Sequence, residues 1–198
     1  MKKWNINGKE LIFDEKTHTY YYDGEKGISV TQIMQKRFNK KYDGIEPEIL
    51  ERAAKRGSYY HQCVEMYEKY GIEAEHQEFR NYLKLKNKYR FEVVDCEIPI
   101  ILQYKGLLIC GQTDLIIKEH RITGLADEKY TARCDEEYLE YQLNFYRLGI
   151  QQTYGIDIDF LRGIHLKNAT SKYLMLPINE QICYELLEEI IGDENYVI

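Results

Sequence analysis

The chain has 198 residues and a formal net charge of -6, with 44% hydrophobic and 30% charged residues. This length and composition predict one compact domain over residues 1–198, with a core on both faces of a sheet and no disordered linker. No apolar run approaches the roughly 18 residues of a membrane span, and no signal-peptide stretch follows Met1, so we expect a cytoplasmic protein without a membrane partner.

Residues 1–45 predict an N-terminal β-hairpin and a short helix. Two β-rich runs, 11–13 and 18–23, are followed by the turn dipeptide Asp23-Gly24, and Ser29 suits the N-cap of the short helix. The apolar spacing over 47–70 then predicts an amphipathic helix that ends at Gly71 and has a break near Gly57. Its predicted buried face includes Ile49, Leu50, Ala53, Ala54, Cys63, Val64 and Tyr67. A second helix is expected over about 75–90.

Residues 46–178 are expected to hold the functional core. Three predicted strands, at 93–104, 107–118 and 122–129, form an antiparallel meander. The pattern continues with a helix over 138–154 and two strands at 160–166 and 173–177. It ends with a C-terminal helix within 179–198. We therefore predict an α+β fold with a mixed central sheet flanked by helices.

Two acids and a lysine lie on the last two strands of this meander. A two-residue hairpin at His120-Arg121 places Asp114 opposite Asp127, whereas a bulge at Gly124 would break that pairing. Carboxylates about 5 Å apart repel by roughly 3 kcal/mol at an effective dielectric of about 20, and a divalent cation would relieve this repulsion. Lys129 follows Asp127 by two residues and shares its face, as phosphodiester hydrolysis requires of a stabilising cation. On these residues alone, ordinary surface ion pairs are the better interpretation.

Two predicted helices carry further candidates. Gly57, His61 and Glu65 recur at four-residue intervals, so Gly57 would allow close backbone approach, His61 would bind a metal and Glu65 would support it. A lone helical histidine is more often structural. Gln142 and Tyr146 share a face of the later helix and could contact a base or sugar.

The sequence also contains two clusters of basic residues. Each cluster suits a solvated helix face and a phosphate track equally. The first consists of Lys36, Arg37, Lys40, Lys41, Arg52, Lys55 and Arg56, and the second of Lys84, Lys86, Lys88 and Arg90.

Four motifs in order resemble those of the RecB-type exonuclease branch of the PD-(D/E)XK nuclease superfamily. They are Arg56-Gly57 with His61, the GxxD run ending at Asp114, Asp127-Glu128-Lys129, and the QxxxY pair Gln142 and Tyr146. The resemblance covers residues 56–146 and implies an αβββαβ core. The segment 18–31 is similar to small phage-encoded members.

This resemblance implies a magnesium- or manganese-dependent deoxyribonuclease. Asp114, Asp127 and Lys129 would be catalytic, and His61, Asp114, Asp127 and the carbonyl of Glu128 would bind the metal. Gln142 and Tyr146, with Arg56 and Lys55, would contact DNA, and Glu65 and Glu97 would support the site. Tyr130 stands where relatives commonly have threonine.

Some relatives carry an iron-sulfur cluster held by C-terminal cysteines. Because only Cys183 lies in the last quarter and the five cysteines are scattered, we expect no cluster, no disulfides, and reduced thiols mostly in the core. The expected role is an end-dependent exonuclease in phage recombination, replication or repair, beside a single-strand annealing or recombination protein, with the oligomeric state open. The alternative is a catalytically silent DNA- or protein-binding module on the same fold.

Overall fold

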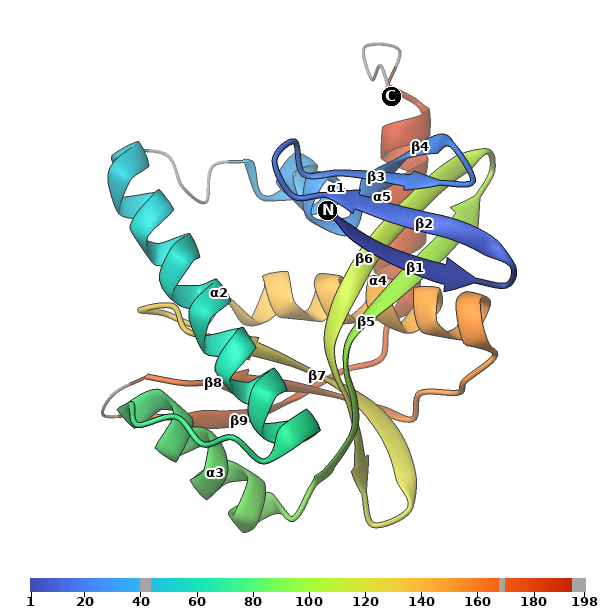
Figure 1. Ribbon diagram of the computed structural model, residues 1–198. Helices are drawn as coiled ribbons and strands as arrows, with labels where there is room; N and C mark the ends of the chain where they lie inside the picture. The colour runs from blue at the N-terminus through green and yellow to red at the C-terminus, as the bar shows by residue number, and fades with distance from the viewer. Residues whose placement is uncertain (40–43, 168–169, 194–198) are drawn as a thin grey trace.

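The computed structural model describes residues 1–39, 44–167 and 170–193. Within these residues a nine-stranded mixed sheet is flanked by helices, which gives the α+β fold expected from the sequence (Figure 1). In chain order the elements are β1 (Lys2–Ile6), β2 (Lys9–Asp14), β3 (Thr19–Tyr22), β4 (Glu25–Ser29), α1 (Val30–Arg37), α2 (Pro47–Tyr70), α3 (Gln77–Tyr89), β5 (Glu92–Tyr104), β6 (Leu107–Glu119), β7 (Ile122–Lys129), α4 (Glu136–Tyr154), β8 (Phe160–His165), β9 (Lys172–Leu176) and α5 (Glu180–Ile191).

The N-terminal segment forms an antiparallel ribbon rather than a single hairpin. The predicted pairing of β2 with β3 is present, but β1 pairs with β2 and β4 pairs with β3. The prediction of one hairpin therefore missed the two outer strands. The signal for β1 is Asn7-Gly8, whose φ angles of 53° and 81° suit the tight turn that this dipeptide favours. At the end of β4, Ser29 caps α1 in a capping box with Gln32, as its position predicted.

The central meander has the predicted register. Glu119 pairs with Ile122 and Leu115 with Ala126, so the connection is the expected two-residue hairpin and Gly124 introduces no bulge. On this same side of β6, the parallel strand β4 pairs with Ile109 and Cys110, while β5 covers the other side. Residues 111–114 of β6 therefore lie where β4 and β7 diverge, and this divergence gives their side chains room to face a ligand.

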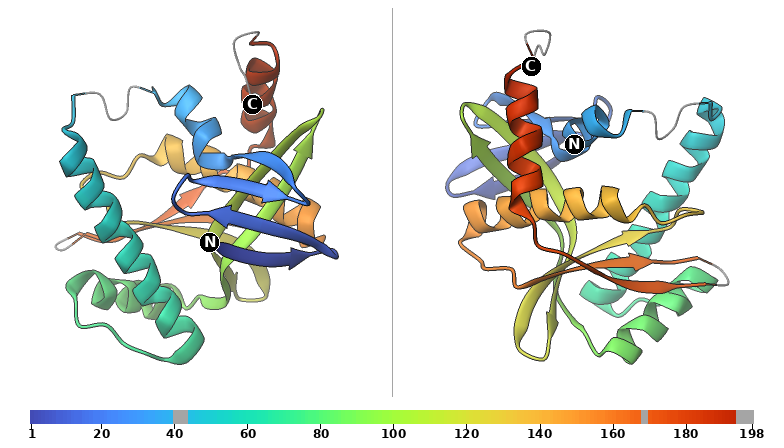
Figure 2. Two further views of the ribbon diagram at one scale, coloured as in Figure 1. Left: turned by 45° about the horizontal axis from the view of Figure 1, so that its top comes forward. Right: turned by 180° about the vertical axis from the view of Figure 1, so that it is seen from behind.

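Helices cover both faces of the sheet. Helices α1, α4 and α5 share one core with strands that include β5 and β6, and α2 and α3 pack on the opposite face around Phe79 and Tyr82 (Figure 2). Helix α4 lies close to β5 at Gly149, where an added Cβ would come within 2.6 Å of Ile100 Cδ1. This contact fixes the distance between α4 and the strands that carry the acids.

Helix α2 departs from its prediction in two respects. It is one unbroken helix through Gly57, and a Cβ at Gly57 would meet nothing within 4 Å, so neither the break nor a close approach within the chain is present. Its first half is exposed, with Ile49 46% accessible, and it rises away from the sheet (Figure 1). Periodicity identifies an apolar face of a helix, but it does not show whether another element covers that face.

None of the helices in the described ranges combines the length and apolar character of a membrane span. All five cysteines are free thiols; Cys96, Cys110 and Cys183 are buried, as expected for core residues, and Cys63 and Cys134 are half-buried.

Candidate functional site

Three acids lie side by side on three adjacent strands. The pairs Cys96 with Leu115 and Ile98 with Thr113 flank Glu97 and Asp114, so these two acids face each other across β5 and β6. The pair Leu115 with Ala126 likewise puts Asp114 next to Asp127 of β7. The expected neighbourhood of Asp114 and Asp127 is thus present, and β5 adds a third carboxylate to it.

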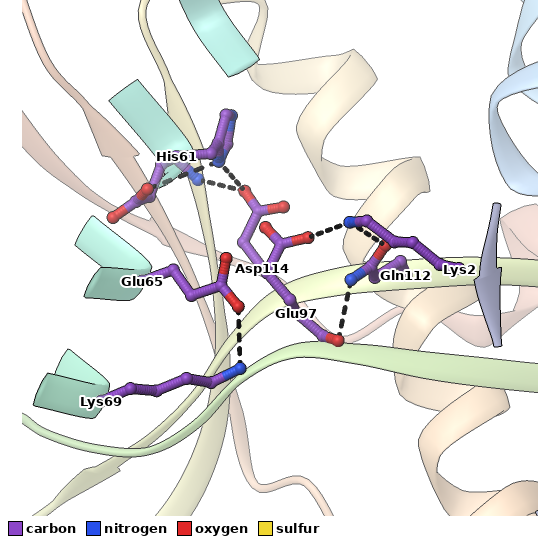
Figure 3. Close-up of polar contacts among 8 residues, drawn as sticks. Lys2, His61, Glu65, Lys69, Glu97, Gln112 and Asp114 are labelled. Atoms are coloured by element: carbon purple, nitrogen blue, oxygen red, sulfur yellow. Dashed lines mark hydrogen bonds and ion pairs between the residues drawn. The ribbon is translucent and has the colours of Figure 1, made fainter. Parts of the chain in front are cut away.

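Helix α2 brings His61 onto this row. Its Nδ1 lies 3.3 Å from Asp114 Oδ2 and 3.4 Å from Glu128 Oε2 (Figure 3). A ring nitrogen of His61 and one carboxylate oxygen each of Glu97 and Asp114 all lie within 4.8 Å of one another. Ligands on opposite sides of a cation at about 2.1–2.4 Å are about 4.2–4.8 Å apart, so the cluster has the dimensions of a divalent-metal site.

Asp127 and Lys129 form an ion pair on the inner side of this cluster. Lys129 Nζ contacts Asp127 Oδ2 at 2.5 Å, which confirms that the two side chains share one face of β7. Asp127 is 1% exposed and its Oδ1 accepts no hydrogen bond within the described chain; the same holds for Oε1 of Glu128. Buried carboxylate oxygens without a partner are costly, and a cation or water would satisfy them.

Burial and mutual repulsion oppose full ionisation of the carboxylates in this cluster. Burial, with the charge of Asp114, raises the pKa of Glu97 to about 7 and that of Asp127 to about 6. Burial also raises the pKa of Asp114, although Lys129 and the Glu128 N–H oppose that shift. Burial works to lower the pKa of Lys129, but Asp127 and Asp114 outweigh it and hold it above its ordinary value. The carboxylates of the cluster therefore carry more negative charge than Lys129 alone neutralises.

His61 is neutral at physiological pH. Burial, with the nearby Lys129 ammonium, lowers the pKa of its imidazole to about 4. A neutral imidazole has a lone pair available to a metal. The Tyr130 ring lies edge-on to His61 at 5.3 Å between centroids, and its hydroxyl donates to Glu128 Oε2 at 3.3 Å. Tyr130 therefore positions both neighbours. Sequence reasoning missed this role, although Tyr130 directly follows β7 and is two residues from Glu128, the spacing of side chains on one face of a strand.

Lys2 and Gln112 support the Glu97 side. Lys2 Nζ lies 3.7 Å from Glu97 Oε2 and donates to Gln112 Oε1 at 3.3 Å (Figure 3). Gln112 Nε2 in turn donates to the Glu97 carbonyl at 2.8 Å, which holds the unusual positive φ of 56° at Glu97. Glu65 pairs with Lys69 at 2.8 Å on the next turns of α2 beside the cluster. The place of Lys2 was not predicted because β1 was missed, although the turn dipeptide Asn7-Gly8 could have indicated that strand.

Gln142 and Tyr146 lie on the α4 side of the carboxylates. Gln142 Nε2 donates to the Tyr146 hydroxyl at 3.1 Å, and both side chains are buried. Burial is the main cause that raises the pKa of the Tyr146 phenol, and the charges of Asp127 and Asp114 raise it further. The Tyr146 ring also rests on Gly111, where a Cβ would come within 3.0 Å of Tyr146 Cε1. Gly111 thus permits the tyrosine to reach the strand that carries Asp114.

The predicted basic residues are less concentrated than the sequence indicates. Lys55 pairs with Glu51 at 2.6 Å, and Lys55 and Arg56 are both exposed on the rising part of α2. Lys36 contacts Asp193 and Arg37 contacts Glu137, while Lys40 and Lys41 fall outside the described residues. In the second cluster, Lys86 pairs with Glu68 at 2.5 Å.

A cavity of about 440 Å³ opens onto the cluster. Helix α2 forms one wall through Ser58 and Gln62, and the N-terminal ribbon forms the other through Lys2 and Glu15, with Glu97 and Asp114 at the base. The candidate metal centre is therefore accessible from outside through a polar opening.

No protein-family model and no curated protein matches this sequence. A solved structure, "Crystal structure of SSO0001", is similar with a TM-score of 0.48 and 16% identity, over 85% of this chain and 76% of that one. A likeness of this extent indicates neither a shared family nor a shared activity.

Proposed function

We propose that the protein is a divalent-metal-dependent DNA nuclease that acts from DNA ends. The observation that carries the proposal is the convergence of His61, Glu97 and Asp114 within 4.8 Å, directly beside the buried Asp127–Lys129 pair. A neutral imidazole and carboxylates are ligands for Mg²⁺ or Mn²⁺, and a fixed ammonium within reach of the same centre is what phosphoryl chemistry requires.

The ligand set of the proposal is wider than the three converging residues. Asp127 and the Glu128 carbonyl keep their expected roles as additional ligands, and the unpartnered Oδ1 of Asp127 supports that role for the aspartate. A bound Mg²⁺ would polarise the scissile phosphate and lower the pKa of an attacking water. Its charge would also relieve the mutual repulsion that raises the pKa values of Glu97 and Asp127.

The chain's own groups have separate tasks in this reaction. Hydrolysis joins a water oxygen to phosphorus and breaks the bond to the leaving ester oxygen, which collects negative charge on the phosphoryl group. Lys129, held by Asp127, is positioned to stabilise that charge. Tyr130 and Glu128 orient His61, and Gln112 and Lys2 hold Glu97.

The order of elements around the site supports membership of the PD-(D/E)XK superfamily. Helix α3, strands β5 to β7, helix α4 and strand β8 follow one another as in the αβββαβ core that the motif resemblance implies. Three of the four motifs lie on elements that this family would require: Asp114 on the second strand, Asp127 and Lys129 on the third, and the glutamine–tyrosine pair on the following helix. His61 of the first motif lies on α2, the helix before α3.

The charge distribution favours an end over a long duplex. The net charge is -6, and Lys36, Arg37 and Lys55 are already paired with acids. Three residues of the first predicted basic cluster are therefore already engaged by acids, which weakens this cluster as a phosphate track for extended DNA. A strand end needs only local contacts, which the polar opening beside Ser58 would supply; Arg56 is exposed on α2 but does not line this cavity.

Linear and circular substrates test this proposal. In Mg²⁺, end-labelled linear DNA should shorten progressively, and a covalently closed circle should survive until it is nicked or cut; EDTA should stop the reaction. Linearisation of the intact circle at a comparable rate would replace the exonuclease proposal with an endonuclease. DNA binding without cleavage in Mg²⁺ or Mn²⁺ would favour the catalytically silent module instead.

A further inference from the structure

A second cavity, of about 490 Å³, lies between the N-terminal ribbon, the start of α1 and strand β6. Its lining includes Phe13, His18, Gln35, Gln112 and Tyr146. We propose that this cavity binds the unpaired base of the terminal nucleotide while its phosphate lies at the metal cluster. The inference rests on the proposed function and adds to it a substrate class, a frayed or single-stranded DNA end.

The ribbon wall is aromatic. Phe13 and Tyr20 pair across β2 and β3, and their rings stack at 4.4 Å between centroids with 24° between their planes. His18 lies in the turn that precedes β3, with its ring centroid 5.8 Å from that of Phe13. Base–aromatic stacking contributes about 1–3 kcal/mol per base and accepts any base, because each has a π-face. This wall therefore suits a nucleobase without selecting one.

The opposite wall is polar. Thr31, Gln32 and Gln35 of α1 are exposed and line the cavity. The Gln32 side chain accepts from the Ser29 N–H at 2.8 Å and so belongs partly to the cap of α1. The Gln35 amide carries both donors and an acceptor, which can bond to the polar edge that an unpaired base exposes. An aromatic wall facing an amide wall is an arrangement suited to a heterocycle with polar edges.

The floor of the cavity joins it to the metal cluster. Gln112 lines the cavity and lies two residues before Asp114 on β6. Its side chain also donates a hydrogen bond to the Glu97 carbonyl. Tyr146 lines the cavity, and its ring packs on Gly111, three residues before Asp114 on β6. A nucleotide whose base enters between Phe13 and Gln35 thus has its phosphate directed toward Asp114.

This arrangement predicts that the terminal base must leave its pair. Residues of the N-terminal ribbon, α1 and β6 all line the cavity, so a base would enter it only after separation from its partner. Unpairing costs less at a frayed or single-stranded end than within a duplex. The protein should therefore act faster on single-stranded ends than on blunt ones.

Oligonucleotides with a normal or an abasic terminal nucleotide test the cavity. The wild-type protein in Mg²⁺ should remove the normal terminal nucleotide about tenfold faster or more, the factor that about 1.4 kcal/mol of lost stacking would give. Phe13→Leu keeps an apolar side chain but removes the ring, so this preference should fall toward unity. Tyr21→Leu removes a 37% exposed ring from the neighbouring position of β3, outside the cavity lining, and should keep the preference. Equal wild-type rates on both ends would overturn the inference.

A second readout separates this inference from the nuclease proposal. With Ca²⁺ in place of Mg²⁺, a terminal 2-aminopurine should lose fluorescence on binding through stacking, less so with Phe13→Leu and unchanged with Tyr21→Leu. Quenching with this pattern in a protein that cleaves no DNA would support the base site and refute the nuclease. Cleavage without quenching or end preference would refute the base site and leave the nuclease proposal standing.

Discussion

Asp114→Asn should stabilise the metal-free protein and at the same time remove its activity. The substitution keeps the size of the side chain and an oxygen that can accept the Glu128 N–H, which now bonds to Asp114 Oδ2 at 2.9 Å. It removes one negative charge from a cluster in which the buried carboxylates repel one another. Since burial raises the pKa of Asp114 despite Lys129, its ionised form is unfavourable in the folded, metal-free state.

The magnitude follows from the separation of the ligand atoms. Carboxylate oxygens of Glu97 and Asp114 within 4.8 Å repel by about 3 kcal/mol at an effective dielectric of about 20. Partial protonation of Glu97, whose pKa is about 7, and the lost attraction to Lys129 reduce the net gain to about 1–2 kcal/mol. For a chain of this length that gain corresponds to a Tm increase of about 2–8 °C.

Thermal unfolding at pH 8 in EDTA and in Mg²⁺ measures both effects. In EDTA, Asp114→Asn should unfold at a higher temperature than wild type. Mg²⁺ should raise the Tm of this variant little, and the variant should lose nearly all DNA cleavage. The exposed Asp157→Asn, in the loop before β8, serves as the matched control and should behave as wild type. A lower Tm of Asp114→Asn in EDTA would refute the electrostatic reasoning, and wild-type cleavage would refute the site.

Other changes probe the lysine, the pH dependence and the packing. Lys129→Met should keep the Tm increase with Mg²⁺ but lower the cleavage rate about 10²–10³-fold in single-turnover assays, because its charge acts in the transition state; unchanged cleavage would exclude that role. The raised pKa values of Glu97 (about 7) and Asp127 (about 6) contribute stability that is complete below their unfolded values and lost as pH rises through about 6–7. The wild-type Tm in EDTA should therefore fall between pH 5 and pH 8, by more than in Asp114→Asn; parallel curves would contradict this. Gly149→Ala should destabilise by about 1–3 kcal/mol in chemical unfolding because its Cβ meets Ile100, whereas Gly57→Ala, with no neighbour within 4 Å, should stabilise by up to about 1 kcal/mol.

Strand register was the most predictable part of the site. The two-residue turn at His120-Arg121 and the period-two alternation of β7 place Asp114 beside Asp127 and Lys129 on the face of Asp127. These relations are local in sequence, and they follow from turn length and strand geometry alone. The helices over residues 75–90 and 180–191 were predictable for a similar reason, since each has its own apolar period and end signals.

Contacts between distant segments were not predictable from pattern. Glu97 faces Asp114 through the β5–β6 register, and its inward orientation depends on a positive φ that no local residue preference indicates. Lys2 reaches the cluster only because β1 joins the ribbon beside β5 and β6. Likewise, the first half of α2 has the apolar spacing of a buried helix, and only the tertiary structure shows that it is exposed among the described residues.

Hydrolysis of a labelled DNA oligonucleotide at increasing Mg²⁺ concentration tests the central claim most directly. If His61, Glu97 and Asp114 hold a catalytic cation, cleavage should be absent in EDTA, increase with Mg²⁺ to a plateau, and resume with Mn²⁺ after chelation. No cleavage at any concentration of either metal, or equal cleavage in EDTA, would contradict a metal-dependent nuclease at this site.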